Sequence, residues 1–368
     1  MRKPYRMSDN EKELLHLIGE HPDMSVKELV AHTKYKWERT VKRKLKQLKE
    51  QEILLGPFYD LNYTKLCKNP LHKLVCIVET NLNYDTVFPY LRIIEPLKWV
   101  YPVLSPHKRL FTAGFFSSND AAIRDVLQLL KDCNIITDYI VRVWDTKRII
   151  KHPNFFGEVN PSLDNLLDPR EYFDISLPHY DTVWNECDIS ILPYMEGGTK
   201  LVEILREEKK QRRTWTYDQI KYSREKMVRN GLIEKLYVIH PFPPEQCAHF
   251  QLFFKTGDID FTERALHNFA EGERVSRQYV LCEGWGKITC MSHPLFLKDL
   301  NRNLDRIDEI VEREIFPKRS FPPGRYCVDQ PSDYTHFNFE AQTLKYPYHI
   351  YEEEIKEKIE RDQLVISV

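Results

Sequence analysis

Residues 25–50 read SVKELVAHTKYKWERTVKRKLKQLKE, and this stretch decides how the amino-terminal region folds. Ser25 and Glu28 form a capping-box pattern, in which the serine side chain accepts from a first-turn amide and the glutamate accepts from the serine amide. A turn follows at residues 33–35. Four apolar residues then recur at helical spacing and predict a longer helix over about residues 36–49: Trp37, Val41, Leu45 and Leu48.

The flanking residues extend this pattern. Ser8 and Glu11 form an earlier capping box, which predicts a first helix. After the long helix, the apolar residues Ile53–Leu55 and Phe58–Tyr59 flank Gly56-Pro57, a pair that favours a turn between two strands. Three short helices followed by a β-hairpin predict a winged helix-turn-helix.

The next segment changes from helical spacing to alternating strands and helices. Lys73–Glu79 and Tyr139–Trp144 have the apolar, β-branched composition of strands, and an amphipathic helix begins after Ser118. With a weaker helix from Tyr84 and two extended segments between, the order is β-α-β-β-α-β. That order predicts a ferredoxin-like domain, an antiparallel sheet with its helices on one face.

Both patterns recur in the second half of the chain. Three helices precede a wing-like hairpin over Leu232–Ile239, and a second ferredoxin-like order ends in a long helix over Pro294–Phe316. The predicted fold class is α+β, with two winged helix-turn-helix domains alternating with two ferredoxin-like βαββαβ domains. The predicted segments are a winged helix-turn-helix at 1–64, a ferredoxin-like domain at 70–146, a connecting segment at 147–186, the second winged helix-turn-helix at 187–243, the second ferredoxin-like domain at 247–320 and an acidic extension at 321–368.

Composition excludes several classes of protein. With 42% hydrophobic residues among 368, the chain has enough apolar surface for folded cores. Its eight cysteines include no C-x-x-C pair, and Cys282, Cys290 and His293 lack a usual zinc spacing, so no metal site is expected. No apolar run of about 20 residues is available to span a membrane. A cytoplasmic protein with reduced thiols and no membrane partner is the expectation.

The net charge of −1 would argue against a nucleic-acid partner if the charge were evenly spread. Residues 1–58, however, carry 13 Lys and Arg against 9 Asp and Glu, whereas residues 329–368 carry 4 against 9. Residues 33–50 alone carry 8 against 2. The predicted third helix is therefore strongly basic, and the carboxyl-terminal segment is acidic.

Five cations project from the third helix opposite its apolar stripe, with no acid expected to pair with them. Such a face is a solvated surface in many helices, but on the third helix of a helix-turn-helix it fits a major groove. Arg39 and Arg43 are predicted to contact guanine edges, whereas Trp37 is expected to lie in the core. The DNA-binding residues predicted in the first copy are Ser25, Lys27, Lys34, Tyr35, Lys36, Arg39, Thr40, Lys42, Arg43 and Lys46.

The second copy is less basic. The outward face of its third helix carries a net charge of only about +1 by helical geometry, and Arg224 stands where the first copy has apolar Leu45. Two interpretations fit this pattern equally well. The second helix-turn-helix is retained for packing or pairing, or it makes a second contact with DNA. The DNA-binding residues predicted in the second copy are Arg212, Arg213, Lys221, Tyr222 and Lys226.

The repeated plan resembles the Lrp/AsnC family of archaeal and bacterial transcription regulators. The resemblance rests on Ser8–Tyr59 with Lys73–Trp144, and again on Asp188–His240 with His249–Phe316, as a pattern without a diagnostic motif. It implies a sequence-specific transcription regulator with double-stranded DNA as partner and no cofactor. By analogy with the dimers of that family, one chain would form a pseudo-dimer, with ferredoxin-like domains that sense a small-molecule effector or mediate assembly. The implied effector site includes Gly114, Ser117, Ser118, Asn119, Gly284 and Gly286.

The sirohaem decarboxylases share this architecture and give an alternative, in which histidines act near a tetrapyrrole. His72, His107, His249 and His293 are the candidates for that chemistry. A lone histidine in a strand or loop is more often a surface or hydrogen-bonded residue, and this alternative leaves the basic third helix unexplained. No nucleotide-binding, metalloprotease or esterase motif is present. The expectation is therefore a DNA-binding regulator with no catalytic residue, which is not an enzyme.

Overall fold

The amino-terminal helices form where the capping residues predict them. The computed structural model describes residues 7–169, 174–319, 328–329 and 332–366. The first three helices are α1 (Asp9–Glu20), α2 (Val26–Ala31) and α3 (Glu38–Glu50). The amide of Ser25 donates to the Glu28 carboxylate at 2.6 Å, and the Glu28 amide donates to the Ser25 hydroxyl at 3.3 Å. These paired bonds satisfy amides that the first turn of α2 would otherwise leave without a partner.

A matching set of three helices forms in the second half of the chain. They are α6 (Glu186–Glu196), α7 (Leu201–Lys210) and α8 (Tyr217–Arg229). α8 begins at a capping box made by Thr216 and Gln219, with bonds of 2.8 and 3.2 Å. The three helices predicted in each copy are thereby confirmed.

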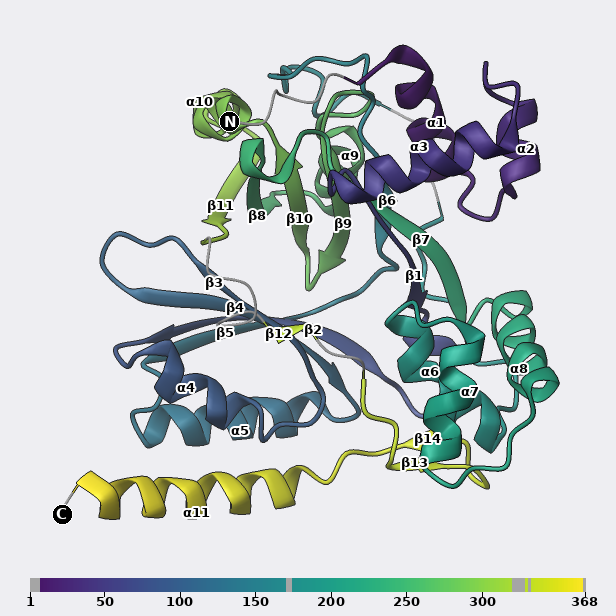
Figure 1. The fold of residues 1–368 in the computed structure, drawn as a ribbon. Coiled ribbons are helices and arrows are strands. Elements are labelled where there is room, and N and C mark those ends of the chain that lie inside the picture. Colours follow the sequence, from purple (N-terminus) through teal and green to yellow (C-terminus); the bar gives the residue numbers. More distant parts are fainter. Residues whose placement is uncertain (1–6, 170–173, 320–327, 330–331, 367–368) are drawn as a thin grey trace. The chain divides into compact units, whose positions relative to one another are not determined.

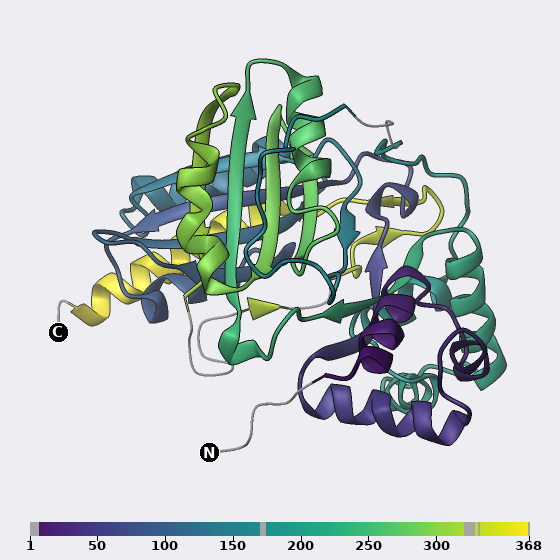
Figure 2. The ribbon, with the colours of Figure 1, turned by 90° about the horizontal axis from the view of Figure 1, so that it is seen from above.

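Two ferredoxin-like domains complete the α+β fold, as predicted. The first contains β2 (His72–Thr80), α4 (Tyr84–Leu91), β3 (Leu97–Val103), β4 (Arg109–Ser117), α5 (Asp120–Asp132) and β5 (Asp138–Val143). The second contains β8 (Ala248–Thr256), α9 (Ile259–Asn268), β9 (Ser276–Cys282), β10 (Trp285–Ser292), α10 (Pro294–Leu304) and β11 (Ile310–Pro317). The strand orders, β3-β4-β2-β5 and β11-β8-β10-β9, match each other. In each domain both helices cover the same face of the sheet (Figures 1 and 2).

The chain divides into two compact units that exchange these parts. Unit 1 contains residues 1–60, 146–176 and 235–317, and unit 2 contains residues 61–145, 177–234 and 318–368. The helix-turn-helix of each copy therefore belongs with the ferredoxin-like domain of the other copy. A hydrophobic cluster in unit 1 joins the first three helices to Ile239, which lies just before the second ferredoxin-like domain.

The two predicted wing hairpins are wrong. Each copy supplies one continuous strand, β1 (Leu54–Leu61) and β7 (Ile233–Ile239), and these two strands pair with each other. Gly56 adopts a φ of 104°, a left-handed value that glycine tolerates, and the chain passes Pro57 without reversing. Pairing between the copies gives a longer ladder than the short arms of a local hairpin would, and isolated short hairpins are only marginally stable.

The predicted long helix over Pro294–Phe316 is also wrong. α10 ends at Leu304 and the chain returns as β11, which supplies the strand next to β8. Helical spacing continues past Leu304 through Ile307 and Val311, but β-branched residues favour strands. Completion of the four-stranded sheet, which pairs the backbone of β8 on both sides, outweighs that local periodicity.

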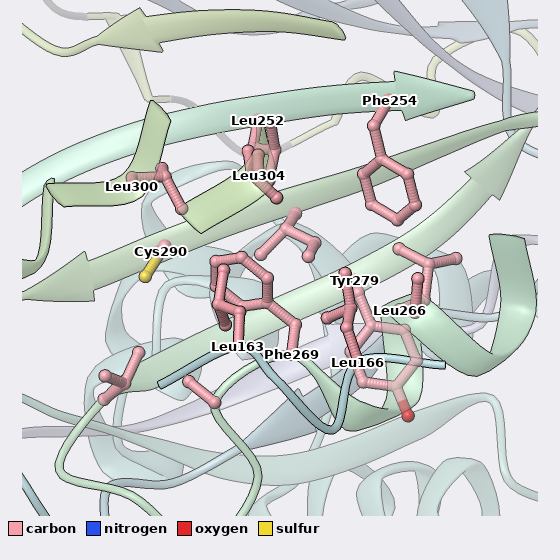
Figure 3. Packing of buried hydrophobic residues seen from close by; sticks show 14 of the residues in the cluster. Leu163, Leu166, Leu252, Phe254, Leu266, Phe269, Tyr279, Cys290, Leu300 and Leu304 are labelled. Atoms are coloured by element: carbon pink, nitrogen blue, oxygen red, sulfur yellow. The ribbon is translucent and has the colours of Figure 1, made fainter. Parts of the chain in front are cut away.

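The described parts of the segments that follow the ferredoxin-like domains add strands and apolar side chains to the two units. β6 (Ile149–Lys151) extends the second sheet beside β9, and β12 (Val328–Asp329) extends the first sheet beside β3. Leu163 and Leu166 insert into the core of the second sheet, near Phe269 and Tyr279 (Figure 3). The remaining elements are two 3-10 turns (Tyr63–Lys65 and Pro244–Gln246), β13 (Phe337–Asn338), β14 (Thr343–Leu344) and α11 (Tyr348–Ile366), which packs against α5.

Candidate functional site

α3 presents one apolar face and one basic face. Val41 and Leu48 are fully buried in the core that α3 shares with α1 and α2. This packing fixes the rotation of α3 and leaves the opposite face in solvent. The cations exposed there are Lys36, just before the helix, and Arg39, Lys42, Arg43 and Lys46.

Two of these five cations have acidic neighbours, which corrects the expectation that none would. Lys42 lies 3.4 Å from Glu38, and Lys46 lies 3.7 Å from Glu50, both at helical i,i+4 spacing. Exposed pairs of this kind contribute only a few tenths of a kcal/mol and separate easily. Lys36, Arg39 and Arg43 form no ion pair with any residue that the structure describes.

Trp37 is exposed, which corrects its predicted place in the core. It is the N-cap of α3, with extended backbone (φ −138°), and 71% of the residue's surface is accessible. Because it precedes the helix, it does not continue the buried stripe of Val41 and Leu48. A large aromatic ring thus stands in solvent next to the basic face.

The other residues predicted in the first copy divide into capping, packing and exposed positions. Ser25 caps α2, as described above. Lys34 is hydrogen-bonded to Glu13 at 2.9 Å, an interaction that raises the pKa of the lysine. Tyr35 packs partly buried against the core of the three helices, and Thr40 is half-buried. Lys27 is exposed and remains available for a phosphate.

In the second copy, Lys226 is partly buried and paired with an acid, which corrects the expectation that it projects outward. Its ammonium donates to Asp188 at 2.5 Å and to the Val183 carbonyl at 2.8 Å, and it lies 5.0 Å from the Trp184 ring centroid. Asp188 is completely buried. This helix position, expected to face outward, instead points toward α6, because α8 packs closely on α6.

The remaining cations of the second copy are exposed but partly paired. Arg213 forms an ion pair with Glu186, and Lys221 lies 3.9 Å from Glu225. Arg212 follows α7 with a left-handed φ of 63°. Tyr222 on α8 is also exposed. Because its cations are partly paired with acids, this surface of the second copy carries charges of both signs.

The predicted effector turn in the first copy is covered by the chain itself. The Ser118 hydroxyl accepts from the Tyr346 amide at 3.1 Å, and the Ser118 amide donates to the Tyr348 hydroxyl at 3.0 Å. Asn119 caps α5, and Ser117 is buried. These groups already have partners within unit 2.

The glycines of the predicted effector site have steric roles. A Cβ on Gly114 would lie 2.3 Å from the Trp99 ring, and one on Gly286 would lie 2.7 Å from Phe254. Gly284 has a φ of 78° in the tight turn between β9 and β10. Each glycine is thus explained by packing or backbone conformation.

A pocket of about 610 Å³ lies in unit 1 and was not foreseen from the sequence. α1 forms one wall with Lys12, His16 and Glu20, and the other walls come from residues 151–156 and from the loop at 270–277. Ligand sites typically have volumes of roughly 300–1,000 Å³. The spacing of Lys12, His16 and Glu20 on one helix face was the sequence signal that could have indicated it.

His152 contributes a neutral imidazole to this pocket. A Cβ on Gly19 would lie 2.7 Å from the His152 ring, so the glycine makes room for the imidazole beside α1. Burial lowers the pKa of His152. Its Nδ1 is buried and has no hydrogen-bond partner among the described residues. A neutral imidazole with an unused nitrogen can ligate a metal or accept a hydrogen bond.

The histidines predicted for catalysis lie elsewhere. His107 is exposed between β3 and β4, and His249 lies with its ring centroid 5.9 Å from that of His240. His293 caps α10, accepting from the Leu295 amide at 3.2 Å. Across the described ranges, no group of three His, Cys, Asp or Glu side chains is arranged to hold a metal ion.

His72 is paired with Asp120 at 2.5 Å, and the hydrogen bond raises the pKa of the histidine. Because its folded-state pKa is raised, the pair stabilises the fold below about pH 6.5, and this contribution disappears as the pH rises through the raised pKa. We expect His72→Ala to cost at most about 1 kcal/mol at pH 6, since the pair is partly exposed, and less at pH 9. Denaturant unfolding at both pH values measures this; an equal cost at both would contradict it.

Comparison with known proteins places this architecture beside an enzyme. Neither the protein-family models nor the curated proteins gave a match. Among solved structures, the sirohaem decarboxylase NirDL matches 96% of this chain and 100% of its own, with a TM-score of 0.52 and 13% identity. The two chains share a fold. NirDL in complex with an iron-uroporphyrin III analogue matches similarly, with a TM-score of 0.52, 12% identity and coverage of 95% and 100%.

Shorter regulators match part of the chain. LrpC of B. subtilis covers 39% of this chain and 97% of its own (TM-score 0.32, 13% identity), and AsnC of E. coli covers 41% and 99% (TM-score 0.31, 14% identity). The expectation that the chain is not an enzyme is corrected by these findings, because the structure that matches nearly its whole length is that of an enzyme. Architecture alone does not separate DNA binding from catalysis. None of the described helices is long and apolar enough to cross a bilayer.

Proposed function

We propose that this chain binds double-stranded DNA through the exposed face of α3. The observation that carries the proposal is that Lys36, Arg39 and Arg43 are exposed and have no acidic partner among the described residues. Unpaired cations on one helix face repel each other, and a phosphate backbone relieves that repulsion while releasing counterions. α3 has 13 residues, about 20 Å at a rise of 1.5 Å per residue, which suits a major groove.

The positions along α3 suggest different roles for the cations. Arg39 and Arg43 lie one helical turn apart and present guanidinium groups that suit guanine edges. Lys42 and Lys46 lie beside them and suit phosphates, since their weak ion pairs separate easily. The exposed ring of Trp37 suits contact with a sugar or a base methyl group. The arginine contacts would select the DNA sequence, and the lysine contacts would supply affinity for any sequence.

The second copy supports an asymmetric mode of binding. Lys226 is committed to Asp188, and Arg213 is paired with Glu186, so fewer cations are free on this copy. We propose that the first copy supplies most of the affinity, with Arg212 and Lys221 as secondary phosphate contacts. A symmetric operator is then not required.

Selection of bound duplexes from a random pool at defined salt tests this function. The full chain should enrich a common sequence, and Arg39→Ala should remove the enrichment at one or two positions. The matched control is Arg229→Ala, because this exposed arginine lies on α8 of the second copy and has no proposed DNA contact. The proposal fails if wild-type protein enriches no sequence and retains no duplex even at low salt.

Replacement of one lysine that contacts a phosphate should reduce the dependence of DNA affinity on salt concentration. Because each neutralised phosphate contributes a slope of about 0.9 in log K against log salt, Lys46→Ala should flatten the slope by about one unit. Affinity should fall to a similar extent for all duplexes. Fluorescence anisotropy at four salt concentrations measures the slope, and an unchanged slope would show that Lys46 does not contact DNA.

A second candidate function is a tetrapyrrole-dependent activity like that of the sirohaem decarboxylase. It is supported by the near full-length likeness in fold and by the unit 1 pocket, where His152 offers an unused ring nitrogen. Lys12, His16 and His32 at the pocket could pair with tetrapyrrole carboxylates. Titration with sirohaem should then give a 1:1 spectral shift that His152→Ala removes. Absence of any saturable shift would exclude this candidate.

A further inference from the structure

The two units share a pair of glutamates at equivalent positions but differ in the groups that contact them. In unit 1, Glu20 ends α1 and Glu271 lies in the loop after α9, and both line the pocket. The corresponding residues of unit 2 are Glu196, which ends α6, and Glu95, which lies in the loop after α4. The same pair of glutamates, one from a helix-turn-helix and one from a ferredoxin-like domain, therefore occurs in both units.

In unit 2, aromatic side chains of the carboxyl-terminal segment occupy this place. The Tyr334 hydroxyl donates to Glu196, which also accepts from Lys98 at 2.6 Å. The Tyr351 hydroxyl donates to Glu95 at 2.6 Å, and His336 lies 3.1 Å from the same carboxylate. Rings bearing hydroxyl donors thus hydrogen-bond to both carboxylates.

In unit 1, the matching place is the open pocket. Its apolar floor includes Leu17, Phe155 and Val275. Glu271 is held by Arg277 and Lys151, whereas Glu20 is exposed and forms no hydrogen bond or ion pair with the described residues. The buried Nδ1 of His152 is a further polar atom without a partner among those residues. The pocket therefore retains an apolar surface and a carboxylate that has no partner among the described residues.

We propose that the unit 1 pocket binds a flat aromatic molecule with a hydroxyl group at one end and an anionic group at the other. The ring would take the place that tyrosine rings occupy in unit 2, and its hydroxyl would donate to Glu20. Lys12 lies two turns earlier on the same face of α1, about 12 Å away at 1.5 Å per residue. Its ammonium provides the positive charge for the anionic end, and the rings of His16 and His32 line the same pocket.

The size of the pocket favours a ligand of about two rings. A volume of about 610 Å³ exceeds that of a single phenol and is typical of sites for drug-sized molecules. Binding at this pocket is independent of the proposed DNA function, because none of the residues that line it belongs to α3.

Calorimetric titration of the full chain with 4'-hydroxybiphenyl-4-carboxylate tests the proposal. One equivalent should bind, and biphenyl-4-carboxylate, which lacks only the hydroxyl, should bind at least tenfold more weakly, because it cannot donate a hydrogen bond to the charged Glu20 carboxylate. Glu20→Gln should bring the two probes to within about threefold of each other. Glu50→Gln, an exposed acid on α3 away from the pocket, should preserve the tenfold preference.

Two results would overturn the proposal: absence of 1:1 binding by either probe, or equal affinity of the wild-type chain for both. Leu17→Trp, which places a large ring in the pocket, gives a second check and should abolish binding of both probes. Thermal unfolding of each variant shows whether the fold is retained, and Glu20→Gln alters only an exposed helix end. DNA affinity is measured separately, so its loss or absence does not affect this result.

Discussion

Replacement of Lys226 by methionine is expected to lower the free energy of unfolding by about 3–5 kcal/mol, because it leaves a buried carboxylate without its cation. Asp188 is completely buried, and one of its oxygens accepts from the Lys226 ammonium at 2.5 Å and from the Asn185 amide at 2.9 Å. The other oxygen has no hydrogen-bond partner among the described residues. Removal of the lysine therefore removes the strongest compensation that Asp188 has.

Chemical denaturation followed by circular dichroism measures this loss. Lys221→Met, on the exposed side of the same helix, is the matched control and should change stability by less than about 0.5 kcal/mol. The double variant with Asp188→Asn should recover part of the loss, since a neutral amide costs less to bury than an unpaired charge. A Lys226→Met chain as stable as the wild type would mean that the ion pair contributes nothing, and would restore this lysine as a candidate DNA contact.

Replacement of Arg39 or Arg43 by alanine is expected to cost about 1–3 kcal/mol of DNA-binding free energy, or roughly 5- to 150-fold in affinity. The loss should depend on sequence, because a guanidinium that contacts a base edge discriminates between bases. Neither arginine is buried or paired with a described acid, so stability should not change.

Competition binding with selected and scrambled duplexes measures both affinity and discrimination. Arg229→Ala, a corresponding change on α8 of the second copy, serves as the control and should leave discrimination intact. If Arg39→Ala and Arg43→Ala weaken all duplexes equally, these residues contact phosphates and the base-contact role is wrong. If neither changes affinity, α3 is not the DNA-binding surface.

Local signals predicted the helices well, because capping residues act within one turn. Ser8 with Glu11 and Ser25 with Glu28 mark helix starts that the structure confirms. The wings could not be predicted in the same way. β1 finds its partner in β7, about 180 residues away, and no local pattern reports a pairing between two copies of a repeat.

The charge pattern predicted the exposed face of α3 but not the ion pair of Lys226 with Asp188. Helical geometry placed Lys226 on the outward side, whereas close packing of α8 on α6 brings it to Asp188. The pocket was missed for a related reason. His152 reaches α1 only because the segment after the first ferredoxin-like domain folds back in unit 1, where Gly19 leaves space for its ring.

The salt dependence of DNA affinity tests the central proposal most directly. The wild-type chain and a variant with Lys36, Lys42 and Lys46 all replaced by glutamine would be titrated against one selected duplex between low and moderate salt. If α3 lies on DNA, the slope of log K against log salt should be several units for the wild type and smaller by about three in the variant. Equal slopes, or no binding by the wild type at low salt, would contradict the account.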